Sequence, residues 1–358
     1  VRHQEVDARE VKRQKRRDED ASGDLPPVRT IYCVCPPNLQ TGGPEAMHQL
    51  CHMINHLSND DGGVNAVMLY LTEDRSRLGG GVQHARHAKP VAAYRRYQTP
   101  LALHLPTQRN ELVVWPEIWT HLMDSLPGQQ AIWWLSVDNN KGRFQDWKKL
   151  NVWHLHQSDY ARTFLEKQGA KRVVPMTEFI PPFSDSQQVE RDVQVLYNPA
   201  KGMHFTDELM KRAPSIQFRP IGAGEKQLRI SPEKVKALLH RAKVYIDFGP
   251  HPGMDRLPRE AAMAHCIVVT NRMGAAGHDT DVPLFPKYKF GTFDVDAIYQ
   301  FLRSCLDDYE THTKELDPYR KWIDGQEDRM KECVSHFLTL IVDQRKQPSP
   351  QESTLKKR

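Results

Sequence analysis

Residues 243–278 restrict the fold of this chain more than any other stretch. Residues 244–248, Val-Tyr-Ile-Asp-Phe, are dominated by β-branched and aromatic side chains, which predicts a buried strand. Two prolines and two glycines within residues 249–253 predict a loop. Because Pro258 suits the first position of a helix, we expect a short helix to follow that loop.

A second strand and a second loop follow this helix. Residues 266–270, Cys-Ile-Val-Val-Thr, predict another buried strand, and residues 274–277, Gly-Ala-Ala-Gly, open a loop. The order strand, loop, helix, strand, loop is half of a doubly wound sheet. Ligands of such sheets bind beyond the carboxyl ends of the strands, so both loops are candidate ligand-binding segments.

The same alternation continues along the chain, and its 358 residues favour two domains. We expect a charged leader, a first domain, a second domain and a polar tail over residues 1–27, 28–182, 183–342 and 343–358. The expected strands are residues 29–35, 65–71, 111–115, 131–137, 152–157, 173–179, 193–197 and 216–221. The other expected helices are residues 44–57, 116–126, 159–168, 206–212, 293–306 and 319–342, and residues 72–100 are expected to be irregular.

The segment Pro-Arg-Glu-Ala-Ala-Met-Ala-His-Cys-Ile-Val-Val-Thr resembles the L-E-A-M-A-x-G-x-P-V-V segment of GT-B glycosyltransferases. The string around it, from His-Pro-Gly-Met-Asp onwards, is similar to bacterial polysaccharide-type members (family 1/4-like). The resemblance implies that Glu260 holds the ribose of a nucleotide sugar and that Gly274 and Ala275 meet its diphosphate. Many retaining members carry another Glu eight residues earlier; here that position is Pro252, so the resemblance leaves retention or inversion open.

Four more segments match the same group: GGPEAMHQL, WWLSVDN, HLHQSDYA and NPAKG. In the last of these, Lys201 and Gly202 match the position whose Lys meets the donor diphosphate. Gly222 begins a small glycine turn that resembles the one packing near the donor base. The resemblance therefore implies an α/β GT-B fold, with two Rossmann-like doubly wound domains facing a cleft.

The implied activity is that of a metal-independent hexosyl- or pentosyltransferase of polysaccharide biosynthesis. Its nucleotide-sugar donor is a substrate and not a cofactor, and its acceptor is a glycan or another hydroxyl compound. Lys201, Arg256 and the amides around Gly274 would stabilise the leaving nucleoside diphosphate. Arg256 pairing instead with Asp255 or Glu260 stays open. The run Asp-Thr-Asp at residues 279–281 has the letters of a D-x-D metal motif, but we interpret it as a turn.

An inverting reaction needs a first-domain base that deprotonates the acceptor hydroxyl. Asp138 is the first candidate, since it follows the strand expected at residues 131–137; the alternative is that it caps the next turn. Glu45 and His48, on the helix after the Gly-Gly loop, are second, and His156 is third. With Pro252 in place of the retaining-type Glu, we favour inversion.

The net charge of +5, from 50 Lys and Arg against 45 Asp and Glu, does not indicate a nucleic-acid partner. The basic cluster at residues 12–17 is followed by three acids, so a solvated tail and a peripheral membrane contact both stay open. Six cysteines without zinc spacing are interpreted as reduced thiols. No apolar signal segment is seen, so we expect a cytoplasmic protein, or a Golgi-lumenal one if an anchor precedes Val1.

Two other functions remain open at this point. One is a nucleotide-sugar epimerase on the same fold, which would convert a single substrate without an acceptor. The other is a non-catalytic relative that binds a sugar nucleotide or a glycan. Hydrolysis of the donor by the purified protein would distinguish a glycosyltransferase from the non-catalytic relative.

Overall fold

The computed structural model describes residues 26–58, 63–74, 81–140, 142, 144–147, 151–183, 189–222 and 230–342. The basic cluster of the leader and the expected polar tail lie outside these residues. The chain forms two compact units. Unit 1 consists of Val1–Gln157, Phe164–Glu178 and Asp328–Arg358, and unit 2 of Ser158–Thr163 and Phe179–Glu327. Apart from the short segment Ser158–Thr163, the second unit begins at Phe179, four residues before the expected boundary, and it ends at Glu327, before the expected last helix does.

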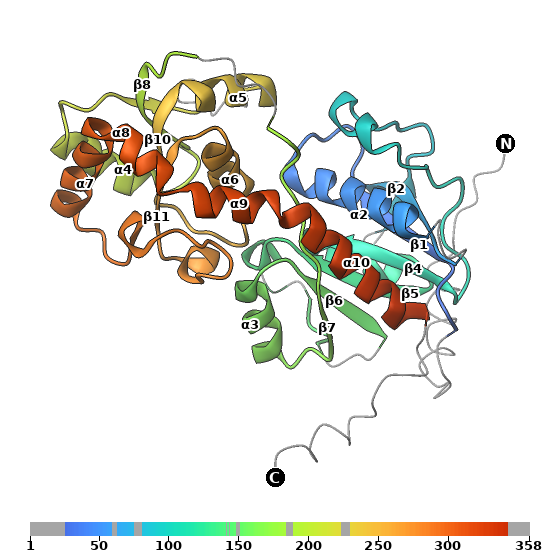
Figure 1. Ribbon diagram of the computed structural model, residues 1–358. Coiled ribbons are helices and arrows are strands. Elements are labelled where there is room, and N and C mark those ends of the chain that lie inside the picture. The colour runs from blue at the N-terminus through green and yellow to red at the C-terminus, as the bar shows by residue number, and fades with distance from the viewer. Residues whose placement is uncertain are drawn as a thin grey trace, which may run out of the picture. The chain divides into compact units, whose positions relative to one another are not determined.

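Unit 1 is built on a seven-stranded sheet in the order β3-β2-β1-β4-β5-β6-β7 (Figure 1). All neighbouring strands are parallel except β2 and β3. The strands are β1 (Thr30–Cys35), β2 (Asn65–Glu73), β3 (Val82–His84), β4 (Glu111–Pro116), β5 (Gln129–Trp134), β6 (Val152–His156) and β7 (Arg172–Pro175). The antiparallel edge strand β3 lies in the stretch expected to be irregular.

The central strands of unit 1 are buried on both faces, as parallel strands covered by helices are. Every residue of β5 is buried, and Trp133 donates its indole N–H to the carbonyl of Met176 at 2.8 Å. Helix α2 (Gly42–Ser58) packs on β1 and β2 through an almost continuous buried face. The helix expected at residues 116–126 is instead the 3₁₀ helix η2 (Glu117–Ser125), which is interrupted at Trp119.

Unit 2 contains a fully parallel five-stranded sheet in the order β12-β11-β10-β8-β9. Its strands are β8 (Val193–Tyr197), β9 (Phe218–Pro220), β10 (Ala242–Asp247), β11 (Ile267–Asn271) and β12 (Lys289–Phe290). The expected pairing of the two strands that flank the first loop is confirmed: β10 and β11 run parallel, with Val244 opposite Ile267. The two sheets are separate, as a two-domain chain requires.

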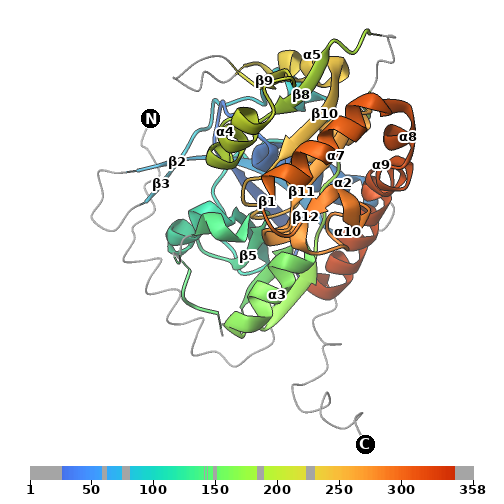
Figure 2. The same ribbon diagram turned by 90° about the vertical axis from the view of Figure 1, so that its left-hand side faces the viewer.

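Helices pack against this sheet and against one another. The bounds are α4 (Met203–Arg212), α5 (Pro232–Arg241), α6 (Arg256–Met263), α7 (Val295–Asp307), α8 (Tyr309–Lys314) and α9 (Asp317–Asp324). Helices α4 and α7 lie side by side (Figure 2), and Arg212 stacks over Tyr299 at 5.0 Å. The hydroxyl of Ser231 accepts from the amide of Lys234 and so caps the N-terminus of α5.

Two helix assignments from the sequence were wrong. Helix α6 begins at Arg256, so Pro258 is its third residue; this is tolerated because the first N–H groups of a helix have no intrahelical acceptor. The helix expected at residues 319–342 is two helices, α9 and α10 (Gln326–Val342), separated at Gly325. Glycine is unfavourable in the interior of a helix, which accounts for the break at Gly325. The next residue, Gln326, is buried, and its side-chain oxygen accepts a hydrogen bond from Arg259 at 2.8 Å.

Two shorter elements follow strands of the sheets: α3 (Asp159–Gln168) and the 3₁₀ helix η3 (Val137–Asn140). Helix α3 has the expected bounds, and the hydroxyl of Ser158 caps it by accepting from the amide of Ala161 at 3.1 Å. Within the described ranges, no helix is both long and apolar enough to cross a membrane.

Candidate functional site

The topology of unit 2 places a candidate ligand site between β8 and β10. These strands are neighbours, yet the chain leaves β8 towards β9 on one side and continues from β10 to β11 on the other. At such a switch point the loops beyond the carboxyl ends separate and leave room for a ligand. Here the loop after β8 carries Lys201 and Gly202, and the loop after β10 carries residues 248–255.

Gly202 allows these two loops to touch. Its φ of +58° lies in the left-handed region, and a Cβ there would stand 2.7 Å from the carbonyl carbon and oxygen of Phe248. Gly249 is equally close from the other side, since its Cβ would stand 2.5 Å from the Cβ of Lys201. Only glycines fit at both positions, so Lys201 is held directly over the end of β10.

Gly274 brings the third loop to the same place. Its φ is +59°, and a Cβ would lie 2.1 Å from the carbonyl oxygen of His251. That oxygen accepts a hydrogen bond from the amide of Ala275 at 2.9 Å. The side chain of Asn271 adds a second link, because it donates to Gly249 O at 2.8 Å and accepts from the amide of Met273 at 2.9 Å.

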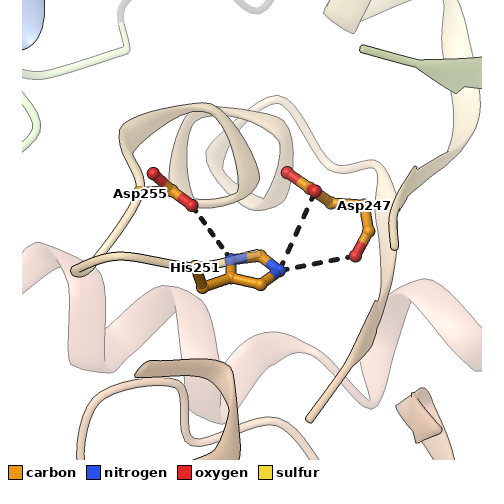
Figure 3. A group of neighbouring side chains, drawn as sticks. All are labelled: Asp247, His251 and Asp255. Atoms are coloured by element: carbon orange, nitrogen blue, oxygen red, sulfur yellow. Dashed lines mark hydrogen bonds and ion pairs between the residues drawn. The ribbon is translucent and has the colours of Figure 1, made fainter. Parts of the chain in front are cut away.

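A buried charged cluster lies beneath these loops, formed by Asp247, His251 and Asp255 (Figure 3). We call it the Asp–His–Asp cluster. Nδ1 of His251 is 3.0 Å from the carboxylate of Asp255. Nε2 faces Asp247, at 3.8 Å from the carboxylate oxygen Oδ1 and 3.4 Å from the main-chain carbonyl. The imidazole ring therefore bridges the end of β10 and the start of α6.

Lys201 joins this cluster by an ion pair with Asp255. Burial alone would raise the pKa of Asp255, but the hydrogen bond from His251 and the charge of Lys201 outweigh it, so this pKa is lowered. Burial raises the pKa of Asp247, and the neighbouring His251 and Lys201 offset only part of that effect. The hydroxyl of Tyr245 also donates to Asp247, at 3.1 Å.

The remaining predicted donor residues surround this point within unit 2. Arg256 and Glu260 face each other on the first turns of α6 at 3.5 Å, which is one of the alternatives left open for Arg256. Gly222, with a φ of +98°, follows β9 at the same carboxyl edge, while residues 223–225 of its turn lie outside the described residues. Lys201, Gly202, Gly274 and Ala275 are thus brought together around His251.

The residues of the Asp-Thr-Asp run have partners within unit 2. Asp279 pairs with Lys289 at 2.6 Å. Asp281 accepts from the amides of Asp159 and Tyr160 at 2.7 and 2.9 Å, at the start of α3. Both carboxylates are engaged in ways that fit the turn interpretation.

In unit 1 the corresponding switch point lies between β1 and β4. Helix α2 starts beyond β1, and its Glu45 pairs with Arg96 and accepts from the hydroxyl of Tyr97 at 2.8 Å. His48 is fully buried: Nδ1 is 2.7 Å from the carbonyl of Pro44 and Nε2 is 2.9 Å from the hydroxyl of Tyr70.

The carbonyl of Pro44 can only accept, so Nδ1 of His48 carries the proton, and burial lowers the pKa of this histidine. The other two candidates for the base lie further along the same edge. Asp138 is exposed on η3, directly after β5, and His156 is the last residue of β6. The roles of Asp138, Glu45, His48 and His156 stay predictions.

Glu117 was missed in the sequence analysis. It is the first residue after β4, is 5% exposed, and accepts hydrogen bonds from the amides of Leu135 and Ser136 beyond β5. Burial raises its pKa from 4.5 to about 7. In the sequence it looks like an ordinary acid in a first helical turn; its position after a buried strand was the available signal. His251 was missed for a similar reason, because its loop was analysed only for glycines and prolines.

Comparison with known proteins supports this architecture. No protein-family model matches the chain, and no significantly similar curated protein was found. The structure of Anabaena HepE in complex with UDP-glucose superposes with a TM-score of 0.58 at 10% identity, over 87% of this chain and 99% of that one. The glycosyltransferase WaaG, involved in lipopolysaccharide biosynthesis, gives 0.51 at 12% identity over 88% and 100%.

A third similar structure is TarM, with a TM-score of 0.52 at 10% identity, over 66% of this chain and 56% of TarM. These similarities, together with two parallel doubly wound sheets in one chain, show that the protein has the GT-B fold. The fold expected from the sequence resemblance is confirmed.

Proposed function

We propose that this protein is a glycosyltransferase, which moves a hexosyl or pentosyl group from a nucleotide sugar to a hydroxyl of a glycan or another acceptor. The observation that carries the proposal is the position of Lys201. Gly202 and Gly249 hold the backbone of Lys201 at the switch point of the unit 2 sheet. Ligands of doubly wound sheets bind at such a point, so a diphosphate bound there would meet this cationic side chain. The complex of HepE with UDP-glucose makes a UDP-sugar the first donor to test.

Each donor residue has a task in this proposal. Lys201 and the amides around Gly274 and Ala275 stabilise the charge that develops on the leaving nucleoside diphosphate. Glu260 offers two carboxylate oxygens to the two ribose hydroxyls, and Arg256 holds that carboxylate in place from one turn away. Gly222 leaves space for the base. Asp138 accepts the proton of the acceptor hydroxyl, which makes the transfer inverting.

Metal independence is part of the proposal. Asp247, His251 and Asp255 are the described residues whose ligand atoms lie close enough to hold a cation. Their arrangement supports a hydrogen-bonded network instead, since the two nitrogens of His251 face different carboxylates and Asp255 already pairs with Lys201. Lys201 then supplies the positive charge that a metal supplies in other transferases.

The cellular setting is a further part of the proposal. All six cysteines are free and five of them are buried, which supports a reducing compartment such as the cytoplasm. The Golgi lumen remains the alternative, and peripheral membrane contact through residues 12–17 remains a proposal, because they lie outside the described residues.

The test is a screen of nucleotide sugars by thermal shift, followed by donor hydrolysis and transfer assays with the donors that bind. A ligand that binds only the folded state stabilises it by RT ln(1 + [L]/Kd) and so raises the melting temperature. We expect a UDP-sugar to bind and to be hydrolysed slowly without acceptor. Binding without turnover would favour the non-catalytic alternative, and conversion of the sugar without release of nucleotide would favour the epimerase. If no nucleotide sugar binds, the proposed function is wrong.

A further inference from the structure

The pairing of Lys201 poses a problem for donor binding. Its ammonium group already forms an ion pair with Asp255, and both side chains are largely buried. A donor diphosphate that recruits Lys201 weakens this pair and leaves a buried carboxylate beside a second anion. An uncompensated buried charge is costly, so another positive charge has to reach Asp255 when the donor binds.

His251 is the group in position to supply that charge. Its Nδ1 is 3.0 Å from the carboxylate of Asp255, which accepts a hydrogen bond from Nδ1–H. Its Nε2 then faces two acceptors of Asp247, the carbonyl at 3.4 Å and the carboxylate at 3.8 Å. A neutral ring with its proton on Nδ1 offers these acceptors nothing, whereas a second proton on Nε2 satisfies them (Figure 3).

Resting on the proposed function, we propose that His251 is a positioning residue that couples donor binding to the uptake of one proton. In the bound state Lys201 turns to the diphosphate, and the imidazolium of His251, between Asp247 and Asp255, neutralises the carboxylate that Lys201 leaves. The proton comes from solvent. His251 does not touch the donor; it acts through Asp255 and Lys201.

Other charged groups face the cluster but are fixed by their own partners. Arg259 binds Gln326 at 2.8 Å and the carbonyl of Met254 at 2.7 Å. Asp281, which lines a small cavity beside His251 with Tyr319 and Arg259, is held by two backbone amides. The remaining neighbours are Tyr245, hydrogen-bonded to Asp247, and the Arg256–Glu260 pair on α6. None of these loses its partner when Lys201 moves.

The experiment measures the affinity for UDP-glucose between pH 6 and 9 by calorimetry, in buffers of different ionisation enthalpy. The diphosphate of UDP-glucose does not titrate in this range, so proton uptake reports the protein. Uptake of one proton on binding makes Kd rise about tenfold per pH unit over the range in which that proton is taken up. We expect this dependence in the wild type, with up to one proton taken up per UDP-glucose bound.

His251→Asn is the central variant, since its amide N–H can replace Nδ1–H towards Asp255 but cannot take a second proton. Its Kd should change less than about threefold between pH 7 and 9, and its proton uptake should vanish. Asp247→Asn should reduce the uptake as well, because it removes the carboxylate that stabilises a proton on Nε2. His265→Asn is the matched control: His265 precedes β11 at the opposite edge of the same sheet, and asparagine tolerates its φ of +64°.

The outcomes separate the two proposals. Binding of UDP-glucose by the wild type without proton uptake overturns the role of His251 and leaves the proposed function standing. Equal proton uptake in the wild type and in a folded His251→Asn variant also overturns it. If His251→Asn does not fold, Asp247→Asn decides, and unchanged uptake in that variant counts against the coupling. Failure of the wild type to bind any nucleotide sugar removes both proposals.

Discussion

At the carboxyl edge of the unit 2 sheet, Lys201, Asp255 and His251 hold one another in one buried network. At the carboxyl edge of the unit 1 sheet, each acid has separate neighbours: Glu117 is held by backbone amides, and Asp138 is an exposed residue of the 3₁₀ helix η3. The glycines differ in the same way. A Cβ on Gly274 would lie 2.1 Å from backbone, while a Cβ on Gly43 would meet nothing closer than 4.0 Å.

This difference fits two separate tasks, donor binding in unit 2 and acceptor activation in unit 1. A donor diphosphate has the same shape and charge in every nucleotide sugar, so a site for it can be rigid and fully paired before the ligand arrives. Acceptors differ in shape, and a base for their hydroxyls has to remain accessible. The comparison therefore predicts that backbone changes are most harmful in unit 2 and that the loss of a single proton acceptor is most harmful in unit 1.

The largest effect is expected for Asp138→Asn. This change removes the proton acceptor and keeps the size of the side chain, so turnover should fall by roughly 10²–10⁴-fold while donor affinity stays nearly constant. Asp124→Asn is the control, since Asp124 is an exposed residue of η2 in the same unit. Steady-state kinetics and product stereochemistry by NMR provide the measurement. Full turnover, or retention of the donor's anomeric configuration, would contradict the role of Asp138 as the base. Glu45, His48 and Glu117 would then be the next residues to test.

The second effect compares the two glycine loops. Gly274→Ala places a methyl group against the carbonyl of His251 at a positive φ, and should cost more than about 3 kcal/mol of the free energy of unfolding. Gly43→Ala, in the first turn of α2, should instead add about 0.5–1 kcal/mol, because alanine is the better helix former. Denaturant unfolding measures both. Equal changes in the free energy of unfolding would show that the backbone of His251 does not restrict position 274.

A third prediction concerns Glu117 and pH. The unfolded chain loses this proton near pH 4.5 and the folded chain near pH 7, so in between the folded state binds more protons. The free energy of unfolding therefore falls as pH rises through this window, by up to about 3 kcal/mol, and is insensitive to this group above it. Glu117→Gln should lack that slope. Unfolding of both proteins at pH 5, 6, 7 and 8 tests this, and parallel curves would contradict the burial of an ionisable carboxyl there.

The sequence was more informative for unit 2 than for unit 1, and the reason is physical. Gly202 and Gly274 stand where only glycine fits, so a pattern of residue types records the close approach of backbones. The ring of His251 and the carboxylate of Glu117 acquire their roles from burial and from partners distant in sequence. The helix expected at residues 116–126 was not assigned as α or 3₁₀, and a single helix was expected where α9 and α10 lie on either side of Gly325.

The fourth prediction tests the donor half directly. Lys201→Ala and Glu260→Ala should each weaken nucleotide binding by about 1.5–3 kcal/mol, since each removes a charge-assisted hydrogen bond, and should leave the fold intact. Lys243→Ala and Glu208→Ala are matched controls in the same unit: Lys243 lies at the amino end of β10, and Glu208 is exposed on α4. Equal nucleotide affinity in all four variants by calorimetry would remove the donor site from this edge of the sheet.

The smallest expected effect is that of a chelator, which should leave activity unchanged. A divalent cation at the Asp–His–Asp cluster would have to displace Lys201 from Asp255 and turn both carboxylates to one side of His251, where the structure has them on different nitrogens. Lys201 already supplies a positive charge at that point, so a metal would be repelled by it. Transfer assays with and without EDTA, and with added Mn²⁺, provide the test. Activity that is lost with chelator and restored by Mn²⁺ would assign the cluster to a metal, and Asp247→Asn should then abolish the Mn²⁺ response.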